Sequence, residues 1–378
     1  MIDTSNKLCT GCSACKAVCP KHAIELVDDI NLFRYPQIDS TKCINCGLCD
    51  KVCPLNKKFN VKLEKVYAAK SKNDEVVNSS SSGGIFYEIA KYVLDNNGYI
   101  CGAAFDDKFQ VHHIIIANFE DLPKLMTSKY VQSRMEDTYS KVKELLDTQK
   151  IVLFSGTPCQ VNGLKSYLRI EYENLICIDI ICHGVPSPRI WQYELGSNIK
   201  DKEISNINFR DKRIDWSHYG TNYKFKDNNE LFIEHNDTIY SKAFLNDLCL
   251  RESCYQCQAK GNNRASDLTL GDFWGVENTE VKLPNKDKGI SLIIAHKQKG
   301  LDILSKINIE YEEVSSDVLK YNPSYNNYST KITERNKYMS KVNEFNYKTL
   351  TLKMSKVSLY SRCKRKTKNI IKKILKTK

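Results

Sequence analysis

Two tight cysteine patterns near the N-terminus offer the clearest chemistry in this chain. The pattern C-x2-C-x2-C-x3-C-P occurs twice within residues 1–57. Three thiolates at this spacing wrap around one 4Fe–4S cluster, and the fourth thiolate reaches the other cluster of the pair. The spacing therefore predicts two clusters, one bound by Cys9, Cys12, Cys15 and Cys53 and the other by Cys43, Cys46, Cys49 and Cys19.

Disulfides and zinc are the alternatives for these eight cysteines. Disulfides are typical of secreted chains, and the first residues of this chain contain no apolar signal segment. A zinc site usually needs two C-x2-C or Cys/His pairs, which is fewer thiolates than the doubled pattern supplies. We therefore favour a two-cluster ferredoxin domain.

Four later cysteines also lie where ligands are expected. Cys159 and Cys182 follow the apolar runs 151–154 and 175–181, and Cys254 and Cys257 form a C-x2-C pair. Together they supply four thiolates, enough for a third 4Fe–4S cluster or for a zinc ion. A free cysteine can also be a small buried apolar side chain, an interpretation that suits Cys101, Cys177, Cys249 and Cys363.

Two polar loops containing glycine precede segments with helical periodicity. The first loop is Ser79–Gly84, and the second is Ser155–Gln160, which directly follows a buried apolar run. Backbone N–H groups in such loops can approach a phosphate, and the helix that follows adds partial positive charge. A capped turn is the alternative for either loop taken alone. Two such loops favour a dinucleotide site at the carboxyl ends of strands.

Hydrophobic periodicity predicts strands alternating with helices. Apolar residues recur with helical spacing in 85–94 and 136–149, and short strand patterns occur at 66–69, 99–105, 111–116, 151–154, 175–181, 207–209, 223–225, 268–270 and 290–294. The predicted fold class is an α+β N-terminal bicluster ferredoxin domain followed by an α/β core. The predicted regions are 1–57, 66–145, 150–300, a helical segment 301–345 and a basic tail 350–378.

Charge is unevenly distributed along the chain. The net charge is +12, and residues 350–378 contain eleven Lys or Arg and no Asp or Glu, so the rest of the chain is close to neutral. No run of 18 apolar residues is present, and the many cysteines indicate a reducing compartment, with the cytoplasm as the expected location. The tail has the pattern of a basic amphipathic helix, which suits peripheral contact with anionic lipid, an acidic protein partner or non-specific contact with nucleic acid. A solvated terminus is the alternative.

Motifs between 66 and 300 add a resemblance to a known family. They are SSSGGIF, CGAAFDD, SKYVQS, FSGTPCQVNGLK, DIICHGVPSP, RESCYQC, GDFWG and KGIS, in that order. The chain resembles the coenzyme F420 hydrogenase/dehydrogenase beta-subunit family, preceded by a two-cluster ferredoxin domain. The resemblance implies that the core is an α/β flavin-binding core with a mixed sheet, which holds FAD. It also implies a third 4Fe–4S cluster held by Cys159, Cys182, Cys254 and Cys257.

The same resemblance suggests flavin contacts in three loops. They are Ser81, Ser82, Gly83, Gly84, Ser128, Lys129, Tyr130, Gln132, Ser133, Ser155, Gly156, Thr157, Pro158 and Gln160. Lys129 would stabilise an anionic reduced flavin, with a surface lysine as the alternative. His183 would donate a proton or bind a cluster sulfur, with a structural histidine as the alternative.

The expected function is an iron–sulfur flavoprotein oxidoreductase. It would pass electrons between the clusters and FAD, and on to a soluble two-electron carrier resembling coenzyme F420 or another small-molecule substrate, with a ferredoxin or other redox protein as partner. The alternative is a non-catalytic electron-relay subunit of a larger redox complex, which the resemblance links to polysaccharide biosynthesis. Because one fold serves many acceptors, the resemblance does not identify the substrate.

Overall fold

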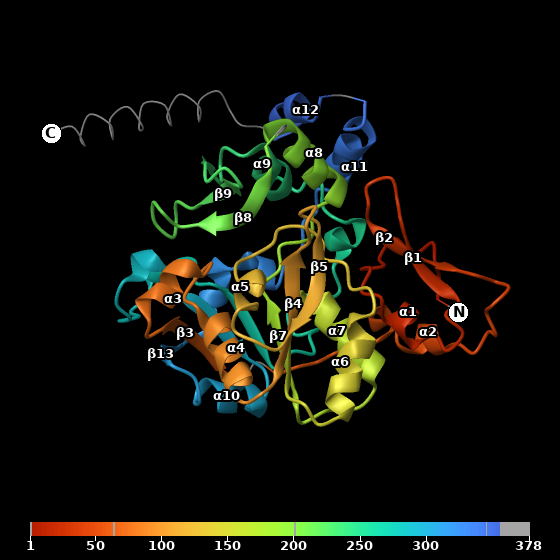
Figure 1. Ribbon diagram of the computed structural model, residues 1–378, viewed down its shortest axis with the longest axis horizontal. Helices are drawn as coiled ribbons and strands as arrows, with labels where there is room; N and C mark the ends of the chain where they lie inside the picture. The colour runs from red at the N-terminus through yellow and green to blue at the C-terminus, as the bar shows by residue number, and fades with distance from the viewer. Residues whose placement is uncertain (1, 63–64, 200–201, 345, 356–378) are drawn as a thin grey trace.

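A small N-terminal domain lies beside a larger α/β body (Figure 1). The computed structural model describes residues 2–62, 65–199, 202–344 and 346–355. In the N-terminal domain an antiparallel hairpin separates the two cysteine patterns. Its elements are α1 (Ala14–Val18), β1 (Ile24–Asp28), β2 (Arg34–Ile38), α2 (Leu48–Lys51) and the 3-10 turn η1 (Pro54–Asn56). This arrangement agrees with the predicted α+β ferredoxin-like domain.

The larger body is built on one mixed sheet, which in the described part of the chain has eight strands in the order β13-β3-β12-β11-β7-β6-β4-β5. Pairing makes β3, β11, β7, β6 and β4 run in one direction, and β12, β13 and β5 run against them. The bounds are β3 (Lys65–Ser71), β4 (Tyr99–Phe105), β5 (Val111–Ile116), β6 (Val152–Gly156), β7 (Leu175–Ile180), β11 (Leu268–Asp272), β12 (Ser291–Ala295) and β13 (Ile309–Val314).

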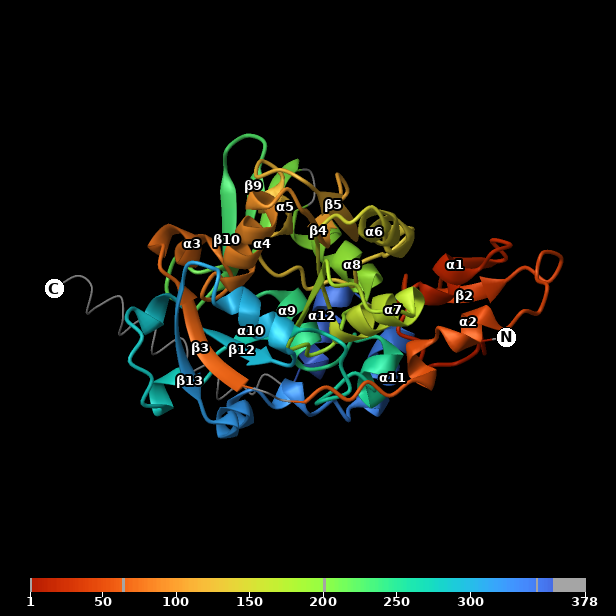
Figure 2. The ribbon, with the colours of Figure 1, turned by 90° about the horizontal axis from the view of Figure 1, so that it is seen from below.

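Helices cover both faces of this sheet (Figure 2). Alternate side chains of β6 point to opposite faces, with Leu153 in one core and Phe154 in the other. The Leu153 core includes α4 (Ile85–Asp95) and α10 (Gln298–Leu304), and the Phe154 core includes α6 (Thr138–Asp147) and α7 (Pro158–Leu168). Each large apolar side chain buried in these cores contributes about 1.5–3 kcal/mol. Because helices cover both faces of the sheet, the sequences of β6 and β7 are continuous apolar runs.

A second, smaller sheet lies near the carboxyl ends of the parallel strands. It has the order β10-β9-β8 and is wholly antiparallel. Aromatic side chains of β8 and of the helices beside it pack together, with Phe209 tilted against Trp191 at a centroid distance of 5.0 Å. The elements are β8 (Ile204–Asp211), β9 (Gly220–Phe225), β10 (Glu230–Glu234), α8 (Pro188–Asn198), α9 (Ile239–Leu245), α11 (Ile332–Lys341) and α12 (Tyr347–Met354), and two short helices elsewhere are α3 (Asp74–Ser79) and α5 (Leu122–Leu125).

One of the predicted regions needs correction. Strands from 66–145 and from 150–300 form one continuous sheet, so these two regions share a single core. The segment 301–345 is not wholly helical, because β13 pairs with β3 at the sheet edge. The predicted basic tail lies outside the described residues from 356 onward. Among the described residues, no helix combines the length and apolar character needed to cross a bilayer.

Candidate redox site

The structure brings together the first predicted cysteine set, which we call the inner set: Cys9, Cys12, Cys15 and Cys53. Burial raises the pKa of the Cys12 thiol to about 12, and the neighbouring Cys9 and Cys53 thiols add to the shift. Burial also raises the pKa of Cys15 well above its ordinary value, with contributions from Cys12, Cys9 and Cys53. Because neighbouring thiols repel one another as thiolates, a bound positive ion would favour their deprotonation. The grouping is the one that the doubled pattern predicts.

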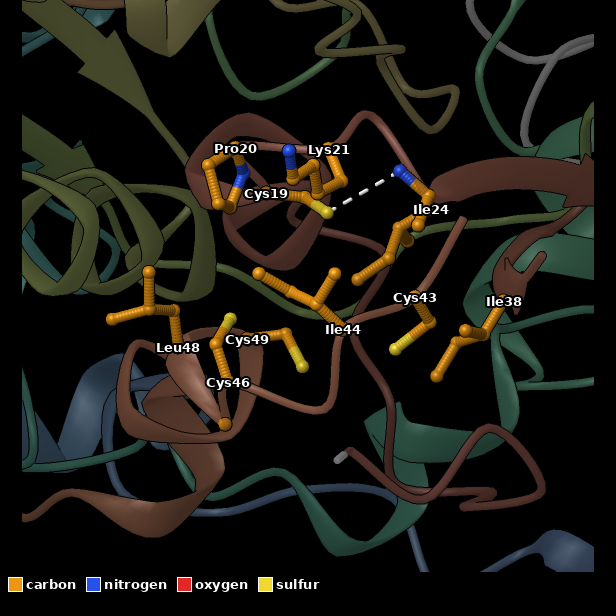
Figure 3. Close-up of a pocket in the computed structure, with 12 residues that line it drawn as sticks. Cys19, Pro20, Lys21, Ile24, Ile38, Cys43, Ile44, Cys46, Leu48 and Cys49 are labelled. Carbon is orange, nitrogen blue, oxygen red and sulfur yellow. Dashed lines mark hydrogen bonds between the residues drawn. The ribbon is translucent and has the colours of Figure 1, made fainter. Parts of the chain in front are cut away.

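The second predicted set, the outer set, lines a small pocket at the far end of the N-terminal domain. Figure 3 shows the side chains of Cys19, Cys43, Cys46 and Cys49 around Ile44, with the Ala23 N–H donating to Cys19 Sγ at 3.3 Å. Cys46 is exposed and Cys49 is buried. Cys19 comes from the first pattern and the other three come from the second, as the exchange of fourth ligands predicts.

The third set, the late set, comes from three separate elements. Cys159 lies in the first turn of α7, Cys182 follows β7, and Cys254 and Cys257 lie in and just after the 3-10 turn η2 (Glu252–Gln256). Burial raises the pKa of Cys159 well above its usual range, and the thiols of the other three members add to this shift. The four cysteines therefore lie within electrostatic reach of one another.

In the described part of the chain, no group of three or more His, Cys, Asp or Glu side chains is arranged to hold a single metal ion. The four late cysteines supply enough thiolates for either a third 4Fe–4S cluster or a zinc ion.

Helix α7 places the inner set next to the late set. A Cβ on Gly163 would lie 2.9 Å from Cys12 Cβ and 3.0 Å from Cys12 Sγ. The same helix begins with the Pro158–Cys159 pair. Tyr139 donates its hydroxyl to the Gln160 carbonyl at 2.7 Å, and both Cys12 and Cys159 influence its ionisation. The two views agree that the N-terminal domain lies beside α7 (Figures 1 and 2).

The contact at Gly163 leads to a first prediction. A Gly163→Ala substitution would put a methyl group against Cys12 and the Tyr139 hydroxyl, where the nearest atom lies at 2.7 Å. We expect a loss of about 1–3 kcal/mol in unfolding free energy from overpacking, with loosened iron in the inner set. Anaerobic chemical unfolding with iron analysis measures both effects.

The matched control is Gly196 in α8, where a Cβ would meet no atom within 4 Å. Gly196→Ala should increase stability by up to about 1 kcal/mol, because alanine has the higher helix propensity. Equal stability of the two alanine variants would contradict close packing at Gly163.

A cavity of about 480 Å³ opens at the carboxyl ends of β6, β7 and β11. This is the edge where α/β sheets bind ligands, and the volume lies within the usual range for a small-molecule site. The wall is mainly apolar on the sides formed by Phe86, Ile178, Phe209 and Phe244. Cys182 of the late set also lines the cavity, so the cavity adjoins that set.

Most of the predicted flavin contacts line this cavity. They are Ser81, Ser82, Gly84, Ser128, Lys129, Tyr130, Ser133, Ser155, Gly156, Thr157 and Gln160. Three predicted contacts do not. Gly83 belongs to the loop from Ser80 to Gly84, which we call the serine loop, but its N–H donates to Ser291 Oγ at 2.9 Å. Pro158 is buried in the first turn of α7. Gln132 instead donates to the Thr10 carbonyl of the N-terminal domain at 3.1 Å.

The serine loop is held in place from the small sheet. Arg210 of β8 is 2% exposed and donates from Nη2 to the Ser81 carbonyl and to Asp272 Oδ1, both at 3.0 Å. Its guanidinium lies 3.7 Å from the centre of the Tyr219 ring. The Nε–H of Arg210 is buried without a hydrogen-bond partner, although Arg210 lines the cavity. An orphaned buried donor here fits a ligand that brings an acceptor.

Lys212 reinforces the same loop. Its Nζ donates to the carbonyls of Val77 at 2.7 Å and Ser82 at 3.1 Å. Burial lowers the pKa of Lys212 to about 8. The Ser82 hydroxyl donates to the Ile290 carbonyl at 2.9 Å, and Ser81 Oγ accepts from the Ser128 N–H at 3.0 Å. The loop from Ser80 to Gly84 is thus fixed by the two cations and by these hydrogen bonds.

His113 is a buried, neutral part of the cavity wall. Burial lowers its pKa to about 4. Because its Nε2 faces the Ser155 carbonyl at 3.1 Å, Nε2 carries the proton and donates. Nδ1 then accepts from the Ser133 hydroxyl at 2.7 Å, and the ring stacks on Phe154 at 5.5 Å. His113 therefore ties the SKYVQS loop to the end of β6.

Both side chains predicted as catalytic line the cavity. Lys129 Nζ donates to the carbonyls of Lys124 at 2.7 Å and Met126 at 2.6 Å, and burial lowers its pKa to about 7. Two of its three N–H groups are therefore used in holding its own loop. His183 donates from Nε2 to Asp247 Oδ1 at 2.7 Å, which fixes its ring beside Cys182.

Sequence reasoning missed several residues of the cavity wall. Arg210, Tyr219 and His113 lie in or beside strands of ordinary pattern, and only their meeting in space marks them. Asp272 and Trp274 lie within the GDFWG motif, which was a usable signal.

Comparisons with known proteins agree with this geometry. Residues 149–317 match the family model for the C terminus of the coenzyme F420 hydrogenase/dehydrogenase beta subunit. Residues 8–57 match a 4Fe–4S dicluster domain. The segment that matches the beta-subunit model contains the late cysteines and the carboxyl ends of β6, β7 and β11, and the segment that matches the dicluster domain contains the inner and outer sets.

Two curated relatives match about half of this chain. A coenzyme F420-dependent sulfite reductase of Methanocaldococcus jannaschii is 30% identical over 188 residues, which covers 47% of this chain and 28% of that protein. The F subunit of the F(420)H(2) dehydrogenase of Methanosarcina mazei is 24% identical over 215 residues, which covers 51% of this chain and 60% of that protein. The matched part is therefore less than two thirds of either relative.

A solved structure of the F420-reducing [NiFe] hydrogenase complex from Methanosarcina barkeri contains a chain with 16% sequence identity and a TM-score of 0.48 to this one. The match covers 76% of this chain and 93% of that chain.

Proposed function

We propose that this beta-subunit family protein is an iron–sulfur flavoprotein that passes electrons between a one-electron protein carrier and a soluble two-electron carrier. The outer, inner and late sets would each hold a 4Fe–4S cluster, and the cavity would hold FAD. When bound, the clusters carry single electrons, and the flavin couples one-electron to two-electron chemistry.

The observation that carries this proposal is the position of Cys182. It belongs to the late set and also lines the cavity, while Cys159 of the same set lies on the helix that packs against Cys12 of the inner set. The cysteine sets are therefore arranged in series between the exposed Cys46 and the cavity. A series of this kind has no use in a protein whose cysteines are only structural.

The chain's own residues would prepare the cavity for a flavin. Arg210 and Lys212 fix the serine loop, and His113 and Lys129 fix the loops opposite it. Lys129 and His183 would contact the bound group at positions where a positive charge and a proton donor favour its reduced form. The names of the relatives support a soluble hydride carrier of the coenzyme F420 type as the two-electron partner.

Anaerobic purification with iron, sulfide, zinc and flavin analysis tests the proposal. We expect about twelve irons, an equal amount of sulfide and one FAD per chain. About eight irons with one zinc would contradict the third cluster, and colourless protein without flavin would contradict the whole proposal.

A relay subunit is the second candidate, because the match spans only 28% and 60% of the two relatives and one of these is named as a subunit. Repeated oxidation of a reduced ferredoxin by the isolated protein with coenzyme F420 present would support the enzyme, and a single oxidation would support the relay.

A further inference from the structure

One buried arginine joins the loops of the inner and late sets. Arg251 is 1% exposed and lies three residues before Cys254. Its Nε donates to the Cys9 carbonyl at 2.8 Å, and its Nη2 donates to the Arg34 carbonyl at 2.9 Å. A single guanidinium therefore connects the chain segment of the late set to the first ligand loop of the N-terminal domain.

The guanidinium of Arg251 also makes a hydrogen bond through Nη1 and packs closely against the ligand loop. Nη1 donates to Gln132 Oε1 at 3.0 Å, and the Gln132 amide in turn donates to the Thr10 carbonyl at 3.1 Å. A Cβ on Gly11, whose φ is +69°, would lie 3.0 Å from Arg251 Nη1. The ligand loop thus approaches Arg251 at a position where the backbone conformation and the lack of space both favour glycine.

The guanidinium of Arg251 donates its hydrogen bonds to neutral oxygens, the carbonyls of Cys9 and Arg34 and the amide of Gln132. Within the described ranges, no Asp or Glu forms an ion pair with it, and the centres of the Tyr35 and Phe33 rings lie 4.2 Å and 5.5 Å away. A buried charge of this kind is costly unless a counter-charge lies nearby. A cluster bound by four thiolates is an anion in both redox states, and Cys9 and Cys254 of two such sets lie within reach of this cation.

We propose that Arg251 is a positioning residue for electron exchange between the inner and late clusters, holding their ligand loops at a fixed separation and raising their reduction potentials through its positive charge. This inference rests on the proposed function. The exchange moves one electron from one cluster to the other and forms or breaks no bond. Hydrogen bonds, net charge and burial are the features by which proteins adjust cluster potentials.

Redox titration of the anaerobic protein, followed by electron paramagnetic resonance, tests this role. Arg251→Gln removes the charge, and we expect lower midpoint potentials for the adjacent clusters. Arg251→Lys keeps the charge, but one ammonium cannot reproduce the planar contacts to Cys9, Arg34 and Gln132. The lysine variant should therefore keep its potentials near those of the wild type while the magnetic interaction between neighbouring reduced clusters weakens.

The matched control is Arg134→Gln. Arg134 also reaches the N-terminal domain, through Asp28 at 3.1 Å, but its side chain is 32% exposed and its charge is screened. We expect this variant to keep wild-type potentials. A shift in Arg134→Gln equal to that in Arg251→Gln would overturn the specific role of Arg251.

The outcomes separate the inference from the proposed function. Full iron in the wild type with unmoved potentials in Arg251→Gln would overturn the role of Arg251 and leave the proposed function standing. A wild type without clusters would overturn both. If Arg251→Gln loses iron, the lysine variant decides, because an unchanged magnetic interaction in that variant contradicts the positioning role.

Discussion

Cys182→Ala is expected to lower the iron content from about twelve atoms per chain toward eight and to abolish electron delivery to the cavity. Cys182 is the member of the late set that lines the cavity, and its thiol is buried with Cys257 close enough to raise its pKa further. Without this thiolate, one iron of the late cluster has no protein ligand. Iron and sulfide analysis of the anaerobic protein measures the loss directly.

The signals of the inner and outer clusters should remain in this variant, because none of their ligands has changed. Cys177→Ala is the matched control. Cys177 lies on β7, the strand that Cys182 follows, is fully buried and belongs to none of the three sets, so its replacement should leave the iron content unchanged. Equal iron in Cys182→Ala and the wild type would contradict a cluster at the late set.

Arg210→Met is expected to prevent flavin retention and to lower the unfolding free energy by about 3–5 kcal/mol, because it leaves a partly buried Asp272 without its cation. The variant also removes the donor to the Ser81 carbonyl, so the serine loop would no longer be fixed against the cavity. The ratio of flavin to protein after gel filtration and the anaerobic unfolding midpoint give the two readouts.

Arg213→Met provides the comparison for this prediction. Arg213 lies three residues further along and pairs with Asp211 and Glu230, but its side chain is 37% exposed. Exposed ion pairs contribute about 0–1 kcal/mol, so this variant should keep both flavin and stability. Similar losses in the two variants would show that the arginine-bound serine loop is not the cause.

Much of the site could be predicted from local sequence patterns. The grouping of Cys53 with Cys9, Cys12 and Cys15, and of Cys19 with the other pattern, follows from spacing alone, and the structure groups the residues in the same way. The sequence also predicts the polar loops that follow α3 and β6 as parts of the site. The carboxyl ends of parallel strands meet at one edge of a sheet, where ligands bind. Sequence spacing is therefore sufficient to predict the grouping of ligands that lie close together in the chain.

Residues that act through distant contacts could not be found in this way. Arg210 lies in an ordinary strand pattern, and Arg251 begins the RESCYQC motif, in which only the cysteines attract notice. Each arginine gains its role only by meeting a loop more than a hundred residues away. Strand β13 was missed because its sequence IEYEEV is acidic and lies at a sheet edge, where exposed charge is tolerated. The resemblance of the SKYVQS motif implies a flavin contact for Gln132, but this side chain turns toward the N-terminal domain and donates to the Thr10 carbonyl.

The exposure of Cys46 gives the molecule two ends of opposite chemical character. At the outer end a metal-bound thiolate would meet the solvent, so a docking protein needs only a brief encounter and no pocket. At the other end, under the proposed function, the small two-electron carrier would have to enter the cavity. The brief contact with the docking protein and the longer contact with the small carrier would therefore occur on separate surfaces. One partner would not have to leave before the other arrives.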